Sequence, residues 1–453
     1  MASLLLFAGA ARSATFTRGF SDDVWFNAGW QAWMPRTVDS GARAVALEID
    51  WDNAEPSAPL RGSDPTNPTN PAYNFAYIDS VVRRFRGTGV QLLFLVTDAP
   101  RWAQGAGGTT AEYATGGFQP NDAALRGFMT ALARRYSGAY PDPAQAGVDL
   151  PRVAYFQAWA EANMAYKLSP QWTRSRGHWF NIGAVIYRHL LNSFYAGVMA
   201  GDPGAKVVFT GLESYGNLPG GPRARPVAFL RSVLCLNTAL AAQRCPDPAH
   251  FDILASDPYD VGSPTTAAIN PDDASAPDLG KLTRVLRAAE ARKTVLPASQ
   301  KPLWVTEFGY ESDPPDSYAV STYTQARWLE ESLYVFWREG VHTVFWYLLR
   351  DRAGSATTGW FSGVYLHDGS PKPALTAYRF PLVVMAAGTR AQVWGISPRN
   401  CTVRVQRLIS GQWHTILAYR RAAGAIFDDH LPLAAHGSYR AVSGPQTSLV
   451  WKY

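Results

Sequence analysis

The sequence predicts an α/β protein whose larger part is a (β/α)8 TIM barrel, followed by a small antiparallel β-domain. Between about residues 40 and 385, short apolar segments of strand length alternate with amphipathic segments of helix length. The alternation repeats about eight times, which is typical of a closed parallel barrel. After residue 388 only short alternating segments remain, separated by Gly, Pro and Asn. A doubly wound open sheet is the alternative for the larger part.

The elements of the barrel follow one another in a regular order. Residues 44–50 form a short apolar run that predicts a buried strand, and residues 74–86 carry their apolar side chains on one helical face. The other strands are expected near 15–20, 90–96, 152–159, 206–211, 251–256, 302–307 and 342–348. The other helices are expected near 24–39, 122–136, 178–200, 225–236, 279–292, 321–339 and 373–385.

We divide the chain into residues 1–14, the barrel at 15–387 and a small β-sandwich-like domain at 388–453. The first part contains an apolar run and ends in a small-x-small pattern at Ala14, which resembles the end of a secretory signal without its basic start. A first barrel strand or an ordered segment is the alternative. We therefore expect a secreted protein. No other segment is apolar enough to span a bilayer, so no membrane association is expected.

Composition and charge exclude several classes of protein. Hydrophobic residues make up 47% and charged residues 17% of the chain, which excludes a disordered protein. The net charge of +6 is carried mainly by Arg without any basic run, so we expect no nucleic-acid partner. The 16 Trp, 21 Tyr and 21 Phe residues suit an enzyme that stacks on sugars, although many must be structural.

Three cysteines and eight histidines show no metal-binding spacing. Cys235 and Cys245 bracket a short polar stretch and are expected to form a disulfide, which leaves Cys401 as a buried thiol. Because HExxH, Walker A, dinucleotide and GxSxG patterns are also lacking from the sequence, we expect neither a metal nor a cofactor.

Two glutamates occupy the strand ends at which barrel enzymes place their chemistry. Glu161 follows the fourth predicted strand, and Glu307 ends the seventh. These strands face each other across the barrel mouth, so the two carboxyl groups can converge on one bond. Hydrolysis of a glycoside with retention needs such a pair, one as proton donor and the other as nucleophile, about 5 Å apart.

Several motifs occur in a fixed order along the chain: I-D-W-D-N-A-E-P ending at 56, D-A-P-R-W-A at 98–103, W-A-E-A-N at 159–163, S-D-P-Y at 256–259, W-V-T-E-F-G at 304–309 and F-W-Y at 345–347. Together they resemble the motifs of glycoside hydrolase clan A, and within it those of family 39 or family 5-like enzymes. The resemblance covers residues 20–385. It implies a barrel with Glu161 as acid/base, Glu307 as nucleophile and a β-linked carbohydrate as substrate.

The same resemblance indicates residues that contact the sugar. Tyr259 is expected beside the nucleophile, and Trp346 is expected beneath the sugar ring. Trp102 is a candidate sugar platform, for which structural packing is the alternative. The full set of expected substrate contacts is Glu48, Asp50, Trp102, Asn163, Tyr259 and Trp346. Arg350 and Asp351, just beyond the last predicted strand, are further candidates to line the mouth.

This chain departs from the family pattern at three positions. Ala160 stands where the family has Asn, Ala46 where it has Arg, and Asp257 where it has His. Each change removes a hydrogen bond near the sugar. A catalytically weak sugar-binding protein on the same barrel is therefore one alternative, and a lyase or metal-dependent hydrolase is another.

Overall fold

The computed structural model describes residues 16–106, 116–355, 357–433 and 435–453. Eight parallel strands form one sheet in the order β7-β4-β3-β2-β1-β14-β11-β9. A parallel bridge between Val208 and Ile253 joins the two ends of this sheet, which closes it and confirms the predicted barrel. The strands are β1 (Thr17–Ser21), β2 (Ala44–Asp50), β3 (Gln91–Thr97), β4 (Tyr155–Ala158), β7 (Lys206–Val208), β9 (Leu254–Ser256), β11 (Leu303–Val305) and β14 (Val341–Tyr347).

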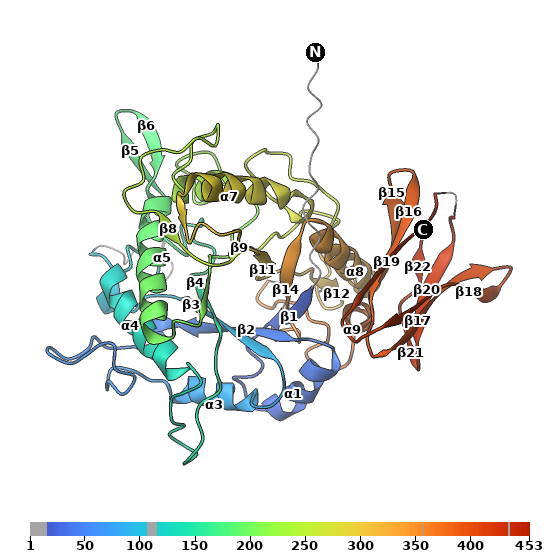
Figure 1. Cartoon of the computed structure of the whole chain (residues 1–453), viewed down its shortest axis with the longest axis horizontal. Helices are drawn as coiled ribbons and strands as arrows, with labels where there is room; N and C mark the ends of the chain where they lie inside the picture. Colours follow the sequence, from blue (N-terminus) through green and yellow to red (C-terminus); the bar gives the residue numbers. More distant parts are fainter. Residues whose placement is uncertain (1–15, 107–115, 356, 434) are drawn as a thin grey trace.

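Helices surround the barrel on its outer side (Figure 1). Three of them begin at residues whose side chains accept a hydrogen bond from the first turn: Asn121, Asn181 and Ser321. The main helices are α1 (Trp30–Asp39), α3 (Ala76–Arg84), α4 (Asp122–Arg135), α5 (Ile182–Gly201), α6 (Pro226–Val233), α7 (Gly280–Arg292), α8 (Thr322–Arg338) and α9 (Pro373–Arg379). Shorter turns are α2 (Trp51–Ala54), η1 (Arg101–Ala103) and η2 (Ala276–Asp278).

The barrel interior is filled by alternate side chains of its strands. Small residues of β2 lie in the same cluster as large residues of β11 and β14, so that the interior is packed: Ala44, Ala46, Leu93, Val208, Ile253, Ala255, Trp304 and Phe345. On β2 the next side chains with the same orientation are Glu48 and Asp50, because side chains alternate along a strand. Their position at the carboxyl end of β2 brings both acids to the barrel mouth.

The C-terminal part consists of two antiparallel sheets beside the barrel (Figure 1). One contains β15 (Leu382–Ala387), β16 (Arg390–Ile396) and β19 (Ile426–Pro432). The other contains β17 (Cys401–Ile409), β18 (Gln412–Arg421), β20 (Ser438–Ser443), β21 (Gln446–Thr447) and β22 (Trp451–Lys452). Trp394 of β16 packs against Phe16 and Trp337, which anchors this β-domain on the barrel.

Some predicted boundaries are wrong. The helix predicted for 373–385 ends at Arg379, because Pro381 cannot continue it, and Leu382–Ala387 form β15. The antiparallel sheet therefore begins a few residues before the expected boundary at 388. The helix predicted for 178–200 begins only at Ile182, since the preceding residues form β6 (His178–Asn181), paired with β5 (Trp172–Ser175).

Minor elements complete the described chain. Two parallel pairs lie outside the barrel: β8 (Ala249–His250) with β10 (Val295–Leu296), and β12 (Ser312–Asp313) with β13 (Val320–Ser321). Cys235 and Cys245 form the predicted disulfide, with their Cα atoms 5.7 Å apart. Cys401 is a free cysteine, but it is half-buried rather than buried. The predicted signal remnant lies outside the described residues, and among those residues no helix has the length and apolarity to cross a membrane.

Candidate active site

The loop after β4 positions Glu161 through an unusual backbone path. Trp159 and Glu161 have positive φ angles of 73° and 36°, a region that residues with side chains rarely adopt and that concentrates at functional sites. The path is held by hydrogen bonds, in which the Trp159 indole donates to the Lys167 carbonyl (2.7 Å) and the Ala162 amide donates to the Thr210 hydroxyl (3.1 Å). The Tyr166 hydroxyl donates to Oε2 of Glu161 at 2.7 Å.

Glu307 lies two residues after the end of β11 and is partly buried. The Tyr259 hydroxyl donates to its Oε1 at 2.7 Å, as the sequence predicts for Tyr259. Burial, and secondly the negative charge of Glu161, raise the pKa of Glu307 to about 8, while the Tyr259 hydrogen bond opposes this rise. The charge of Glu161 therefore acts on Glu307, and the two glutamates belong to one electrostatic site.

A third glutamate, Glu213, belongs to this site. Glu213 follows β7, and its pKa is raised to about 7 by burial and by the charge of Glu161, with which it also shares a hydrogen bond. Arg223 lies 3.7 Å from Oε1 of Glu213 and lowers that pKa. Glu213 was not predicted; it lies in the loop that follows β7, beyond the predicted strand.

Asp257, at the family's His position, is buried beside Glu307. It accepts a hydrogen bond from the Thr306 hydroxyl at 2.7 Å. Burial and the charge of Glu307 raise its pKa well above the usual range. A Cβ atom at Gly211 would lie 1.9 Å from Oδ2 of Asp257, so a glycine is required there. The aspartate therefore replaces the histidine as a buried acid packed beneath the glutamates.

The opposite side of the mouth, at the ends of β2 and β3, carries exposed charges. Glu48 is half-exposed, and Lys167 Nζ lies 3.9 Å from its Oε1. Carboxylate oxygens of Glu48, Asp50 and Asp98 lie within 4.8 Å of one another, an arrangement whose chemistry would suit a hard cation such as Ca²⁺. Burial raises the pKa of Asp98 to about 6, and Lys167 opposes the rise. Lys167 already supplies one positive charge to this group.

A cavity of about 280 Å³ adjoins these acids. It lies between the ends of β1, β2 and β14, and its lining includes Ser21, Glu48, Tyr77, Tyr347 and Arg352. The cavity therefore connects two predicted sugar contacts, Glu48 and Asp50, with aromatic side chains on which a sugar can stack. Tyr347 and Arg352 were not predicted as contacts.

Trp346 is not where the sequence prediction placed it. Its side chain is 2% exposed, packs against Phe308 and Tyr310, and donates to the Ser362 carbonyl. Because side chains alternate along β14, Trp346 points outward toward the helices, while the next residue, Tyr347, points into the mouth. The prediction of Trp346 beneath the sugar is therefore wrong.

Asn163 is a structural residue rather than a substrate contact. It is completely buried, and its amide donates to the carbonyls of Glu213 and Ala224 and accepts from the Glu213 amide. These bonds tie the loop after β4 to the loop after β7, and so set Glu213 beside Glu161. Trp102 is half-buried, packs on Trp51 and donates to the Glu55 carbonyl, so its role as a sugar platform stays a prediction.

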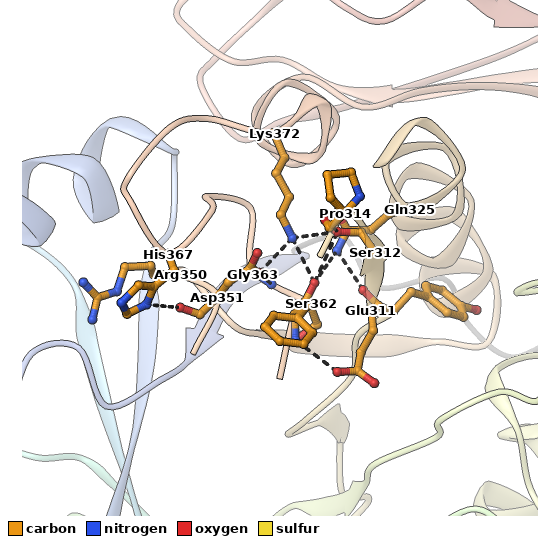
Figure 2. A network of polar contacts seen from close by, with 12 residues as sticks. Glu311, Ser312, Pro314, Gln325, Arg350, Asp351, Ser362, Gly363, His367 and Lys372 are labelled. Atoms are coloured by element: carbon orange, nitrogen blue, oxygen red, sulfur yellow. Dashed lines mark hydrogen bonds and ion pairs between the residues drawn. The ribbon is translucent and has the colours of Figure 1, made fainter. Parts of the chain in front are cut away.

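A buried ionic network fixes the loop after β14 (Figure 2). Lys372 Nζ lies 2.7 Å from Oδ1 of Asp351 and also donates to the Ser312 hydroxyl and the Phe361 carbonyl. Both charged side chains are 1% exposed. The prediction that Asp351 lines the mouth is therefore wrong. The network instead ties this loop to the segment that follows Glu307.

Arg350 was predicted, like Asp351, to line the barrel mouth. In Figure 2 its side chain points away from the network. Its guanidinium lies 5.0 Å from the centre of the Trp33 ring. It is not among the residues that line the cavity beside Glu48. The arginine that reaches this cavity is Arg352, two residues further along the chain.

Comparisons with known proteins agree with the fold. The chain resembles a family 39 glycoside hydrolase from Bacteroides cellulosilyticus WH2 (TM-score 0.55, 16% identity, 94% of this chain and 80% of that chain). It also resembles a family 39 β-xylosidase from Caulobacter crescentus (TM-score 0.50, 15%, 95% and 96%) and a glucosidase from Croceicoccus marinus (TM-score 0.50, 13%, 94% and 94%). No family model matches the sequence, and no curated protein does. At these identities the comparisons show the fold, and they confirm the resemblance at that level.

Proposed function

We propose that the protein is a retaining glycoside hydrolase that cleaves β-linked glycosides with Glu161 and Glu307. The observation that carries the proposal is the pair of glutamates that follow the carboxyl ends of β4 and β11, each with its own tyrosine donor, with the charge of Glu161 raising the pKa of Glu307. The resemblance in fold to family 39 enzymes supports it.

In the first step Glu307 attacks the anomeric carbon as a carboxylate, and Glu161 protonates the leaving oxygen. The bond between sugar and leaving group breaks, and a covalent ester to Glu307 forms. In the second step Glu161, now a carboxylate, removes a proton from water, which attacks the anomeric carbon and releases Glu307. Two inversions give a product with the original configuration.

Glu213 acts on Glu161 rather than on the substrate. Because burial and the charge of Glu161 raise its pKa to about 7, a fraction of Glu213 is protonated near neutral pH and can donate to Glu161 when Glu161 is a carboxylate, as in the second step. The Asn163 bonds keep it in this position. We assign Glu213 as a positioning residue whose removal changes the pH dependence of the reaction.

The substrate classes to test first are aryl β-xylosides and aryl β-glucosides, since the similar structures include a β-xylosidase and a glucosidase. The disulfide between Cys235 and Cys245 is compatible with the proposed export of the protein, because disulfides persist in oxidising compartments.

The experiment that tests the proposal follows the hydrolysis of 4-nitrophenyl glycosides by proton NMR. We expect turnover, with the β-anomer of the sugar appearing first. An α-anomer as first product would contradict retention. Binding of sugars without any turnover would favour a sugar-binding protein, a reading that Ala46 and Ala160 support because neither can donate a side-chain hydrogen bond.

A further inference from the structure

A second cavity, of about 630 Å³, lies away from the barrel mouth. It is bounded by the start of β1 and the segment before β2 on the barrel side, and by the turns at 397–398 and 421–426 of the β-domain. The amino ends of β1 and β2 form this part of the barrel, so the cavity is separate from Glu161 and Glu307, which stand at carboxyl ends.

Four arginines line this cavity: Arg18, Arg43, Arg379 and Arg421. One acid, Asp39, faces them within the lining. In the described part of the chain no ion pair joins any of the four guanidinium groups to a carboxylate. Their hydrogen-bond partners are neutral groups: the carbonyls of Tyr378, Ala42, Asp39, Arg420 and Ile426 and the hydroxyl of Tyr365.

Arg18 is the critical member of the group. It is 4% exposed, and its guanidinium lies 5.2 Å from the centre of the Tyr378 ring. Burial lowers the pKa of Arg18 most, Tyr378 opposes this shift, and the positive charge of Arg43 adds to it. A buried charge is costly unless an opposite charge lies beside it, and here the neighbouring charge has the same sign.

We propose that this cavity binds a tetrahedral oxyanion, phosphate or sulfate, free or as the ester group of a sugar. Guanidinium groups match such oxygens in paired hydrogen bonds, and each of the four retains N–H donors beyond those used for carbonyls. The bound anion would neutralise Arg18 and bridge the barrel to the β-domain. The volume exceeds the need of a single ion, which leaves room for an esterified sugar. This proposal is independent of the hydrolase reaction.

The test titrates the full chain with inorganic phosphate, inorganic sulfate, glucose 6-phosphate and glucose by calorimetry at constant ionic strength. We expect saturable binding of one anion per chain that added glucose does not displace. Tighter binding of glucose 6-phosphate than of phosphate would show that the cavity prefers a sugar ester. Equal affinity for both would show that it recognises the oxyanion alone. The Arg43→Gln/Arg421→Gln variant should weaken binding at least about tenfold, because charge-assisted hydrogen bonds are lost.

The matched control is Arg126→Gln/Arg284→Gln, which removes two exposed arginines outside the lining of the cavity and should bind like the unaltered protein. Melting temperatures in phosphate and in chloride separate specific binding from the general stabilisation by excluded salts, which all variants share. Absence of saturable binding, or the same affinity in the Arg43→Gln/Arg421→Gln variant, would overturn the proposal.

Discussion

The two sides of the barrel mouth differ in how their acids are held. On the side of β9, β11 and β14, Asp257 is buried and Glu307 is partly buried, each accepts a hydrogen bond from a hydroxyl group, and the Lys372–Asp351 network fixes the adjoining loops. On the side of β2 and β3, Glu48 is half-exposed beside Lys167, and a cavity adjoins it. The enclosed side suits a reaction that needs fixed charges, and the open side suits recognition of a variable substrate.

The largest effect is expected when the enclosed side loses its nucleophile. Glu307→Ala should reduce kcat/KM by several orders of magnitude on every glycoside, because no covalent intermediate can form. Added azide should restore turnover with a product of inverted configuration. Near-normal activity of this variant would refute the assignment.

The effect of removing the proton donor should depend on the leaving group of the substrate. Glu161→Ala should reduce kcat/KM by about 10²–10⁴-fold for poor leaving groups and much less for activated aryl groups. Azide should rescue this variant with retained configuration, as measured by NMR of the glycosyl azide. An azide product of inverted configuration would show that the roles assigned to Glu161 and Glu307 are reversed.

The ionic network of Figure 2 is expected to matter for stability. Lys372→Met leaves the Asp351 carboxylate buried without its cation, which should lower the free energy of unfolding by about 3–5 kcal/mol in urea denaturation. The double variant Lys372→Met/Asp351→Leu should lose less free energy of unfolding, because it leaves no unpaired charge buried. Equal losses in both variants would show that packing, rather than charge, is responsible.

The pH profile measures the coupling between the acids. Glu307 must be ionised to attack, so activity should fall as the pH drops below its pKa. Glu161→Gln removes a negative neighbour and should move the acid limb of kcat/KM, measured with an activated aryl glycoside, to lower pH. Tyr259→Phe removes a donor to the carboxylate and should move the limb to higher pH. Shifts of the opposite sign would contradict the coupling.

Glu213→Gln is expected to change the pH dependence of kcat/KM more than it changes kcat at the optimum pH.

The smallest effect is expected on the open side. Glu48→Gln keeps the shape of the side chain and removes its charge beside Lys167. We expect a change in KM of a few fold and little change in kcat, because exposed ion pairs contribute only about 0–1 kcal/mol. A large fall in kcat would contradict this expectation and would show that Glu48 takes part in the chemical step.

Much of the fold could be predicted because strand and helix periodicities persist through the barrel. The strand 44–50 was predicted to the residue, and strand-end logic found Glu161 and Glu307. That logic did not distinguish Trp346 from Tyr347, since a shift of one residue reverses the direction of a side chain. The positions of Lys167 and Asn163 depend on loops, whose hydrogen bonds have no periodic signal in the sequence. The segment Leu382–Ala387 was predicted as the end of a helix but forms a strand, because a short apolar run is compatible with either element.

The central claim, a covalent intermediate on Glu307, can be tested by trapping it. A 2-deoxy-2-fluoro β-glycoside with a dinitrophenyl leaving group forms the ester but slows its hydrolysis. Peptide mass spectrometry should then find the sugar on the peptide that contains Glu307, with no sugar bound in the Glu307→Ala variant. A label on Glu161 or Glu213, or turnover with inversion and no label, would contradict the account.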